Sequence, residues 1–136
     1  MAKVLALDIG GKRTGIAESD PLQMMAFPLK TVSTTELMEI LENYISSEKP
    51  RTVVIGKPAM LRKGPTDSTE IIEMWAKKIH LRWPLLEIIF VDEDFTSQEA
   101  ALMLIRGGMR KSKRKEKGAV DKVAASLILE RYLAMH

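Results

Sequence analysis

The sequence predicts an α/β protein in which helices pack against a mixed β-sheet. Short apolar runs recur along the chain, and the first of them, 4–9, is closed by glycines and has no helical period, which is typical of a strand buried on both faces. Later runs are separated by stretches with apolar residues three and four positions apart, the pattern of amphipathic helices. Three strands followed by alternating helices and strands indicate an antiparallel meander continued by right-handed crossovers onto parallel strands.

The individual elements follow from local patterns. After the first strand, a tight hairpin at 10–13 leads into a returning strand at 14–19, and Asp20-Pro21 turns the chain. Side chains at 33–35 are suited to cap the first helix. The remaining strands are expected at 27–32, 52–56 and 86–91, and the helices at 35–48, 67–82, 97–106 and 120–133.

Length and composition indicate a single globular domain over residues 1–136. The chain has 46% hydrophobic and 29% charged residues, a balance that does not suit a disordered protein. It contains no cysteine, which excludes disulfides, thiolate zinc sites and cysteine nucleophiles. The N-terminal apolar run is too short for a signal sequence or a membrane span. We therefore expect a soluble, cytoplasmic protein that does not associate with membranes.

The positive charge is concentrated in one segment. The formal net charge is +3, but residues 106–117 carry seven cations against one acid, a net of +6, which leaves −3 for the rest of the chain. A mildly acidic body with one basic segment favours binding to a polyanion, nucleic acid first among them. The alternative is a solvated basic loop.

Acidic residues stand at the ends of three predicted elements. Asp8 ends the first strand, Glu93 lies with Asp92 and Asp94 after the strand at 86–91, and Asp121 lies in the first turn of the last helix. Each has an ordinary explanation: Asp8 can begin a turn, the cluster can face solvent, and Asp121 can favour the helix dipole. Spacing alone does not show whether the three acids meet in space.

If they meet, the acids suit metal-assisted hydrolysis of phosphodiesters. Hard divalent cations prefer oxygen ligands, and two such ions can activate a water and stabilise a leaving oxygen. No competing set of catalytic residues is present: the chain has two histidines, His80 and His136, and neither a phosphate-binding P-loop nor a serine nucleophile elbow.

Four ordered motifs carry a family resemblance that covers nearly the whole chain. They are Asp8-x-Gly10-x-x-Arg13-x-Gly15-Ile16-Ala17, then Val54-Ile55-Gly56-Lys57-Pro58, then Asp92-Glu93-x-Phe95-Thr96-Ser97-x-x-Ala100, and finally Val120-Asp121-Lys122-x-Ala124-Ala125 after Gly107 and the basic run. This pattern resembles the YqgF family, also called RuvX, whose members are described as Holliday junction resolvases and as pre-16S rRNA nucleases. The resemblance implies a ribonuclease H-like fold with a five-stranded mixed sheet, helices on both faces, and acids gathered around Mg²⁺ or Mn²⁺.

The resemblance also implies roles for individual residues. Asp8, Glu93 and Asp121 correspond to the catalytic, metal-binding acids. Asp94 departs from the pattern, because the family usually has arginine there, and this acid replaces a partner for phosphate or carboxylate. The residues expected to bind nucleic acid are Arg13, Lys57, Arg62, Lys63, Arg110, Lys111, Lys113, Arg114, Lys115 and Lys117.

The leading hypothesis is a metal-dependent endonuclease that acts on structured nucleic acid, with precursor ribosomal RNA as substrate. A four-way DNA junction is the alternative substrate, and it would favour a two-fold homodimer because paired cuts need paired sites. The second hypothesis is a nucleic-acid-binding module without cleavage, in which the acids are caps and turns. An actin-like ATPase is a third, for which the chain is too short to form two lobes.

Overall fold

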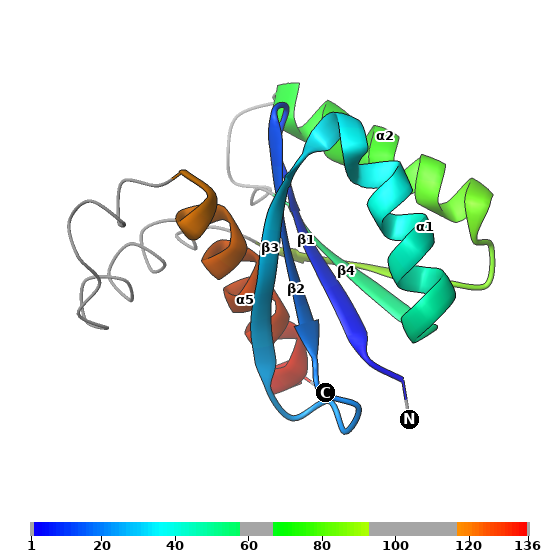
Figure 1. Ribbon diagram of the computed structural model, residues 1–136, viewed down its shortest axis with the longest axis vertical. Coiled ribbons are helices and arrows are strands. Elements are labelled where there is room, and N and C mark those ends of the chain that lie inside the picture. The colour runs from blue at the N-terminus through cyan, green and yellow to red at the C-terminus, as the bar shows by residue number, and fades with distance from the viewer. Residues whose placement is uncertain (1, 58–66, 93–116, 136) are drawn as a thin grey trace.

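The computed structural model describes residues 2–57, 67–92 and 117–135 and contains a five-stranded sheet (Figure 1). The predicted helix at 97–106 and the segment 58–66, which contains Arg62 and Lys63, lie outside these residues. The strands are β1 (Val4–Ile9), β2 (Arg13–Ser19), β3 (Ala26–Ser33), β4 (Thr52–Lys57) and β5 (Glu87–Asp92). The helices are a short 3₁₀ turn (Thr34–Glu36), α1 (Leu37–Glu48), α2 (Asp67–Arg82) and α5 (Lys117–Met135).

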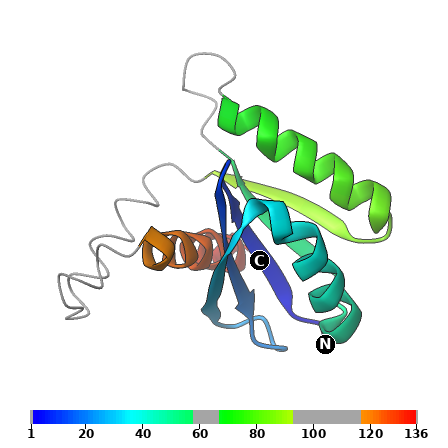
Figure 2. The same ribbon diagram turned by 45° about the horizontal axis from the view of Figure 1, so that its top comes forward.

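The sheet is mixed, as predicted. Its order is β3-β2-β1-β4-β5, with β1 in the centre. β1, β2 and β3 pair antiparallel, whereas β4 is parallel to both β1 and β5. Two crossovers therefore follow the meander, and the carboxyl ends of β1, β4 and β5 point to the same edge of the sheet (Figure 2). Ligands of open α/β sheets bind outside this edge.

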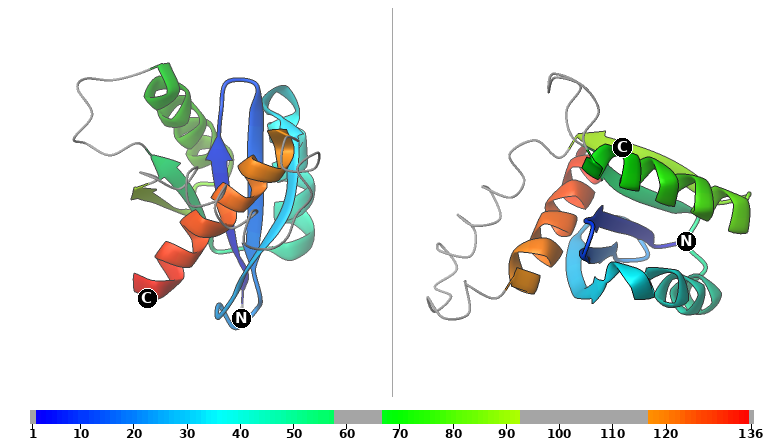
Figure 3. Two further views of the ribbon diagram at one scale, coloured as in Figure 1. Left: turned by 90° about the vertical axis from the view of Figure 1, so that its left-hand side faces the viewer. Right: turned by 90° about the horizontal axis from the view of Figure 1, so that it is seen from above.

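Helices cover both faces of the sheet, and the alternation along β1 shows how (Figure 3). Leu5, Leu7 and Ile9 pack in one core with residues of α1 and α2. Val4 and Ala6 pack in a second core with residues of α5. The continuous apolar run of β1 thus reflects burial on both faces, and each fully buried leucine stabilises the fold by roughly 1.5–3 kcal/mol.

The start of α1 differs from the prediction. A 3₁₀ turn precedes the helix, and neither Ser33 nor Glu36 makes a side-chain capping bond. The Ser33 hydroxyl instead lies 2.9 Å from the Thr35 hydroxyl, and Thr34 is used in a contact with the β1–β2 hairpin. In place of capping the helix, the Thr34 hydroxyl makes tertiary contacts, and the Ser33 and Thr35 hydroxyls contact each other.

Two further features concern turns and membranes. The predicted turn at Asp20 is confirmed: its Oδ1 accepts hydrogen bonds from the N–H groups of Met24 and Met25 at 2.8 and 2.7 Å. The bond from Met25 is the main cause of a lowered pKa for Asp20. Among the helices in the described residues, none is long and apolar enough to cross a membrane.

Candidate functional site

Asp8 lies within the central strand, near its carboxyl end, with a glycine beside it on each neighbouring strand. It pairs directly with Gly15 of β2. Leu7 pairs with Ile55 of β4, so the next residues on these two strands are Asp8 and Gly56. Asp8 is half-buried and, by the alternation of β1, lies on the same face as Val4 and Ala6, toward α5.

The two glycines lie on this same face. Ala17 of β2 and Val54 of β4 pack in the core on the α5 side, and Gly15 and Gly56 are each two residues away from them. The two residues directly beside Asp8 on the neighbouring strands therefore carry no side chain. A glycine inside a strand often marks a site where a ligand or another backbone approaches closely.

The hairpin after Asp8 is held by a defined set of hydrogen bonds. The Gly10 N–H donates to the Arg13 carbonyl oxygen at 2.9 Å, and a Cβ atom at Gly10 would lie 2.7 Å from the same oxygen, so only glycine fits. The Thr34 hydroxyl donates to the Gly10 carbonyl oxygen at 2.7 Å. The tight turn is thus built by residues other than Asp8, which lies within the strand.

Arg13 shares the face of Asp8, whereas Lys57 does not. The Thr14 side chain contacts Thr34 in the 3₁₀ turn before α1, so Thr14 lies on the α1 face of the sheet. Because side chains alternate along β2, Arg13 lies on the α5 face. Lys57 instead makes an ion pair with Glu73 of α2 at 3.5 Å, and its Nζ lies 5.0 Å from the centre of the Phe90 ring. Lys57 therefore lies at the carboxyl edge but on the opposite face of the sheet.

The end of β5 lies level with Asp8. Gly56 pairs with Val91, which is buried in the core on the α5 side, so Asp8, Gly56 and Val91 form a row across three strands on one face. Asp92 is the last residue of β5, and alternation directs its side chain to the other face, as for its pair Lys57. Arg131 of α5 donates from Nη1 to the Asp92 carbonyl oxygen at 2.7 Å, which fixes this strand end to the helix.

Asp121 lies in the second turn of α5, one turn before Ala125. The helix begins at Lys117, three residues earlier than predicted, and Ala125 packs on the sheet with Ile128 and Leu129. Figures 1 and 3 show that α5 starts nearer the hairpin end of the sheet and runs toward the end where both termini lie. The side chains of Asp121 and Lys117 are outside the described part of the structure.

The remaining predicted site residues are not described by the structure. These are Glu93, together with Asp94, and the cations Arg62, Lys63, Arg110, Lys111, Lys113, Arg114 and Lys115. Within the described ranges 2–57, 67–92 and 117–135, no group of three or more acidic or histidine side chains is arranged to hold a metal ion. The described part of the predicted site therefore consists of Asp8 and Arg13 on one face and Lys57 on the other, with the backbone of Lys117 and Asp121.

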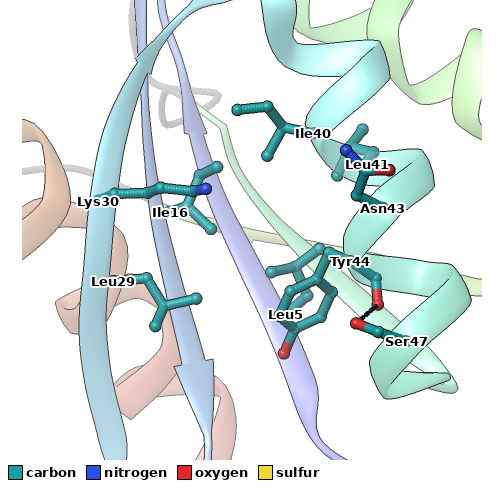
Figure 4. Close-up of a pocket in the computed structure, with 9 residues that line it drawn as sticks. All are labelled: Leu5, Ile16, Leu29, Lys30, Ile40, Leu41, Asn43, Tyr44 and Ser47. Carbon is teal, nitrogen blue, oxygen red and sulfur yellow. Dashed lines mark hydrogen bonds between the residues drawn. The ribbon is translucent and has the colours of Figure 1, made fainter.

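A pocket on the other face is apolar and separate from Asp8. It lies between α1 and the strands β2 and β3, and Figure 4 shows its lining residues. Leu5, Ile16 and Leu41 form its floor, and no acidic side chain lines it. It offers no ligand for a metal, so it is not a candidate for the catalytic site.

Sequence reasoning missed the part played by the glycines and by Thr34. Gly15 interrupts one predicted strand, and Gly56 lies at the end of another. A glycine in such a position is the signal that could have indicated a close approach of a ligand. That both flank Asp8 depends on the strand register, which the sequence does not show.

Comparison with known proteins gives a consistent result. The model of a family described as "RuvX: Holliday junction resolvase" matches residues 2–135. A protein of Christiangramia forsetii named "Putative pre-16S rRNA nuclease" is 41% identical over 98% of both chains. A protein of the same name from Bacteroides thetaiotaomicron is 37% identical over 98% of this chain and 96% of its own length.

Solved structures share the fold at low identity. The yeast mitochondrial Holliday junction resolvase has a TM-score of 0.58 at 11% identity, covering 97% of this chain and 78% of that one. Thermus thermophilus RuvC in complex with a Holliday junction substrate has a TM-score of 0.53 at 17% identity, covering 99% of this chain and 96% of that one. These likenesses confirm the predicted ribonuclease H-like fold.

Proposed function

The chain belongs to the RuvX family, and from that premise we propose that it is a metal-dependent nuclease that processes the precursor of 16S ribosomal RNA. One observation carries the proposal: Asp8 stands on the central strand between Gly15 and Gly56, on the face toward α5. A half-buried carboxylate flanked directly by two glycines is suited to hold a ligand that approaches the backbone closely. The name shared by the curated relatives supports the choice of substrate.

The donor set fits Mg²⁺ or Mn²⁺. We propose that Asp8, Glu93 and Asp121 hold the metal, because all three offer carboxylate oxygens, the ligands that hard divalent cations prefer. Two facts about the described residues support this set: Val91, two residues before Glu93, is level with Asp8 on its face, and Asp121 lies one turn before the sheet-packed Ala125. When bound, a divalent ion activates a water and stabilises the leaving oxygen of the phosphodiester.

The chain's other residues position the substrate. Gly15 and Gly56 place no side chain directly beside Asp8, and Arg13 brings a cation to the same face. The cations between Arg110 and Lys117 neutralise further phosphates, a role that orients the nucleic acid without reading its sequence. Lys57 lies on the α2 face. It therefore contacts the nucleic acid only where the nucleic acid passes around the carboxyl ends of β4 and β5.

A four-way DNA junction is the second candidate substrate. The description of the family and the names of the structural neighbours favour it. Symmetric cleavage of a junction requires two active sites related by a two-fold axis, so this substrate implies a homodimer. The two candidates therefore differ in oligomeric state as well as in nucleic acid.

The substitution Asp8→Asn tests the proposed chemistry. Removing the charge while keeping the shape should lower cleavage of a labelled pre-16S rRNA fragment in Mg²⁺ by at least ~100-fold, with binding within about twofold of wild type. Glu39→Gln, an exposed acid of α1 on the opposite face, is the matched control and should cleave normally. A four-way junction run in parallel decides between the substrates. Cleavage by Asp8→Asn at the wild-type rate would falsify the proposal.

Metal binding can be measured without activity. Mn²⁺ is paramagnetic and should broaden the amide signals of Asp8, Gly15 and Gly56 while leaving that of Leu22, in the distant β2–β3 turn, sharp. The broadening should disappear in Asp8→Asn. The alternative outcome is that the protein binds nucleic acid equally well after chelation of metals and yields no cleavage product with any divalent metal. The protein would then be a non-catalytic binding module.

A further inference from the structure

A second pocket lies at the opposite edge of the sheet, where β4 and β5 begin. It is formed by the segments that follow α1 and α2, and it encloses about 390 Å³. Trp83, Leu85 and Leu86 supply apolar walls, and Lys49, Arg51 and Arg82 supply cations around them. Asp8 is near the carboxyl end of β1, so this pocket is separate from the proposed catalytic site.

The apolar part of the pocket is unusually exposed. Leu85 is 100% accessible to solvent, although it directly precedes the buried Leu86. Single exposed leucines are common, but here the leucine adjoins an indole and two prolines around a hollow. Exposed apolar surface surrounded by polar groups is typical of a protein-binding site.

Three cations and no acid are among the residues that line the pocket. Lys49 and Arg51 are exposed, and within residues 2–57, 67–92 and 117–135 neither makes an ion pair. Arg82 pairs with Glu42 at 3.2 Å, and its guanidinium carbon lies 5.1 Å from the centre of the Trp83 ring. Two of the three cations are thus available to an acidic ligand.

Hydrogen bonds hold the pocket in shape before any ligand binds. Lys49 adopts a left-handed conformation (φ 50°) and donates its N–H to the Ile45 carbonyl at 3.0 Å, which ends α1. The Glu87 N–H donates to the Arg51 carbonyl oxygen at 2.9 Å and joins the two segments. The Leu86 N–H donates to the Trp83 carbonyl oxygen at 3.1 Å. A preorganised pocket loses little conformational entropy on binding, which favours affinity.

We propose that this pocket docks an acidic segment of a partner protein, which inserts one aliphatic or aromatic side chain between Trp83 and Leu85. Charge complementarity assigns the acids of the partner to Lys49 and Arg51. A protein segment fits better than RNA, because the exposed Leu85 offers apolar contact that phosphates cannot use and Arg82 already lies over the Trp83 ring. A partner bound here leaves the Asp8 edge open and can bring the enzyme to its substrate.

A fluorescein-labelled peptide, in which a Leu-Phe pair is flanked on both sides by runs of Asp and Glu, tests the proposal by anisotropy. We expect a dissociation constant of about 10–100 μM. Arg51→Glu should weaken binding by at least ~10-fold and Leu85→Ser by about three- to tenfold, because they remove the charge contact and the apolar wall. Lys77→Glu reverses an exposed cation of α2 outside the pocket and should change binding by less than about twofold. All three sites are exposed, so thermal unfolding should match wild type.

Two altered peptides separate the contributions. A peptide with Gly-Ser in place of Leu-Phe should bind wild type more weakly than the parent peptide. A peptide with Asn and Gln in place of Asp and Glu should also bind more weakly, and Arg51→Glu should not change its affinity. The proposal is overturned if the parent peptide does not bind at about 1 mM, or if Lys77→Glu weakens binding as much as Arg51→Glu. It is also overturned if an oligouridylate displaces the peptide and its binding requires Arg51, because the pocket then binds RNA. If Arg51→Glu dissociates a dimer of this chain, the pocket binds a second copy, and the proposal is again wrong.

Discussion

The side-chain oxygens of Thr14 and Thr34 lie 2.9 Å apart in the interior, where they join β2 to the start of the α1 segment. The Thr34 hydroxyl gives its hydrogen to the Gly10 carbonyl at 2.7 Å, so Thr14 is the donor to Thr34. The backbone N–H of Thr34 also donates to the Lys12 carbonyl at 3.0 Å. One threonine thus holds the hairpin that immediately follows the strand of Asp8.

Thr34→Val should lower the free energy of unfolding by about 1–3 kcal/mol. Valine keeps the shape but removes both side-chain hydrogen bonds, and the Thr14 hydroxyl and the Gly10 carbonyl lose a partner. Urea denaturation measures the change. Thr35→Val is the matched control, because the exposed Thr35 hydroxyl contacts only the Ser33 hydroxyl among the bonds described, and it should cost less than about 0.5 kcal/mol. Equal losses in the two variants would contradict a special role for Thr34.

The strand and helix pattern could be predicted because it follows from burial. The β1 strand agrees with its predicted bounds, and the switch from apolar runs to helical periodicity placed α1, α2 and α5. The capping of α1 was wrong because capping rules consider only local neighbours. Thr34 finds its partner in Thr14, twenty residues earlier, and such a contact leaves no mark on the local sequence.

The candidate site was only partly predictable for a related reason. A carboxylate interrupting an apolar strand singled out Asp8, and the resemblance supplied Glu93 and Asp121, which stay predictions. The face of the sheet on which each side chain lies depends on the strand register and on the alternation of side chains along the strand. Lys57 was therefore grouped with Arg13 by sequence, although the sheet directs these two cations to opposite faces.

Tyr44 should make stability depend on pH in the alkaline range. Its hydroxyl donates to Glu18 at 2.8 Å, and burial, followed by this bond, raises the pKa of Tyr44 above its ordinary value of 10.0. The unfolded chain loses the phenol proton near pH 10, whereas the native state keeps it. The stabilisation is therefore complete below about pH 10 and is lost as the pH rises further.

The comparison with Tyr44→Phe isolates this effect from the titration of lysines. Between about pH 9 and pH 11, the free energy of unfolding should fall more steeply for wild type than for Tyr44→Phe. Urea titrations at each pH provide the measurement. Parallel pH profiles for the two proteins would show that the Tyr44 phenol titrates alike in the folded and unfolded states.

Arg131 should act as a positioning residue for the end of β5. Its bond to the Asp92 carbonyl fixes the residue that precedes Glu93, so Arg131→Met should lower kcat by about three- to tenfold with little change in KM, if Glu93 holds the metal. Because this bond is exposed, the stability should change by less than about 1 kcal/mol. Arg131→Lys keeps a cationic donor and should restore part of the rate. A rise in KM alone would indicate that Arg131 binds substrate instead.

Gly15→Val places a branched side chain directly beside Asp8 on the face toward α5. Valine suits a strand, and overpacking against α5 should cost no more than about 1–3 kcal/mol. Cleavage should nevertheless fall by at least ~10-fold, because the added side chain lies directly beside the carboxylate that we propose holds the metal. Gly15→Ala should give a smaller loss in the same direction.

Thr35→Val is the control for this series, because Thr35 is exposed and its hydroxyl contacts only the Ser33 hydroxyl among the bonds described. It should leave the rate within about twofold of wild type. Rates are compared at a temperature where circular dichroism shows all the variants folded. If Gly15→Val folds and cuts at the wild-type rate, the space beside Asp8 is not used by the substrate, and the glycines then serve only the packing of α5.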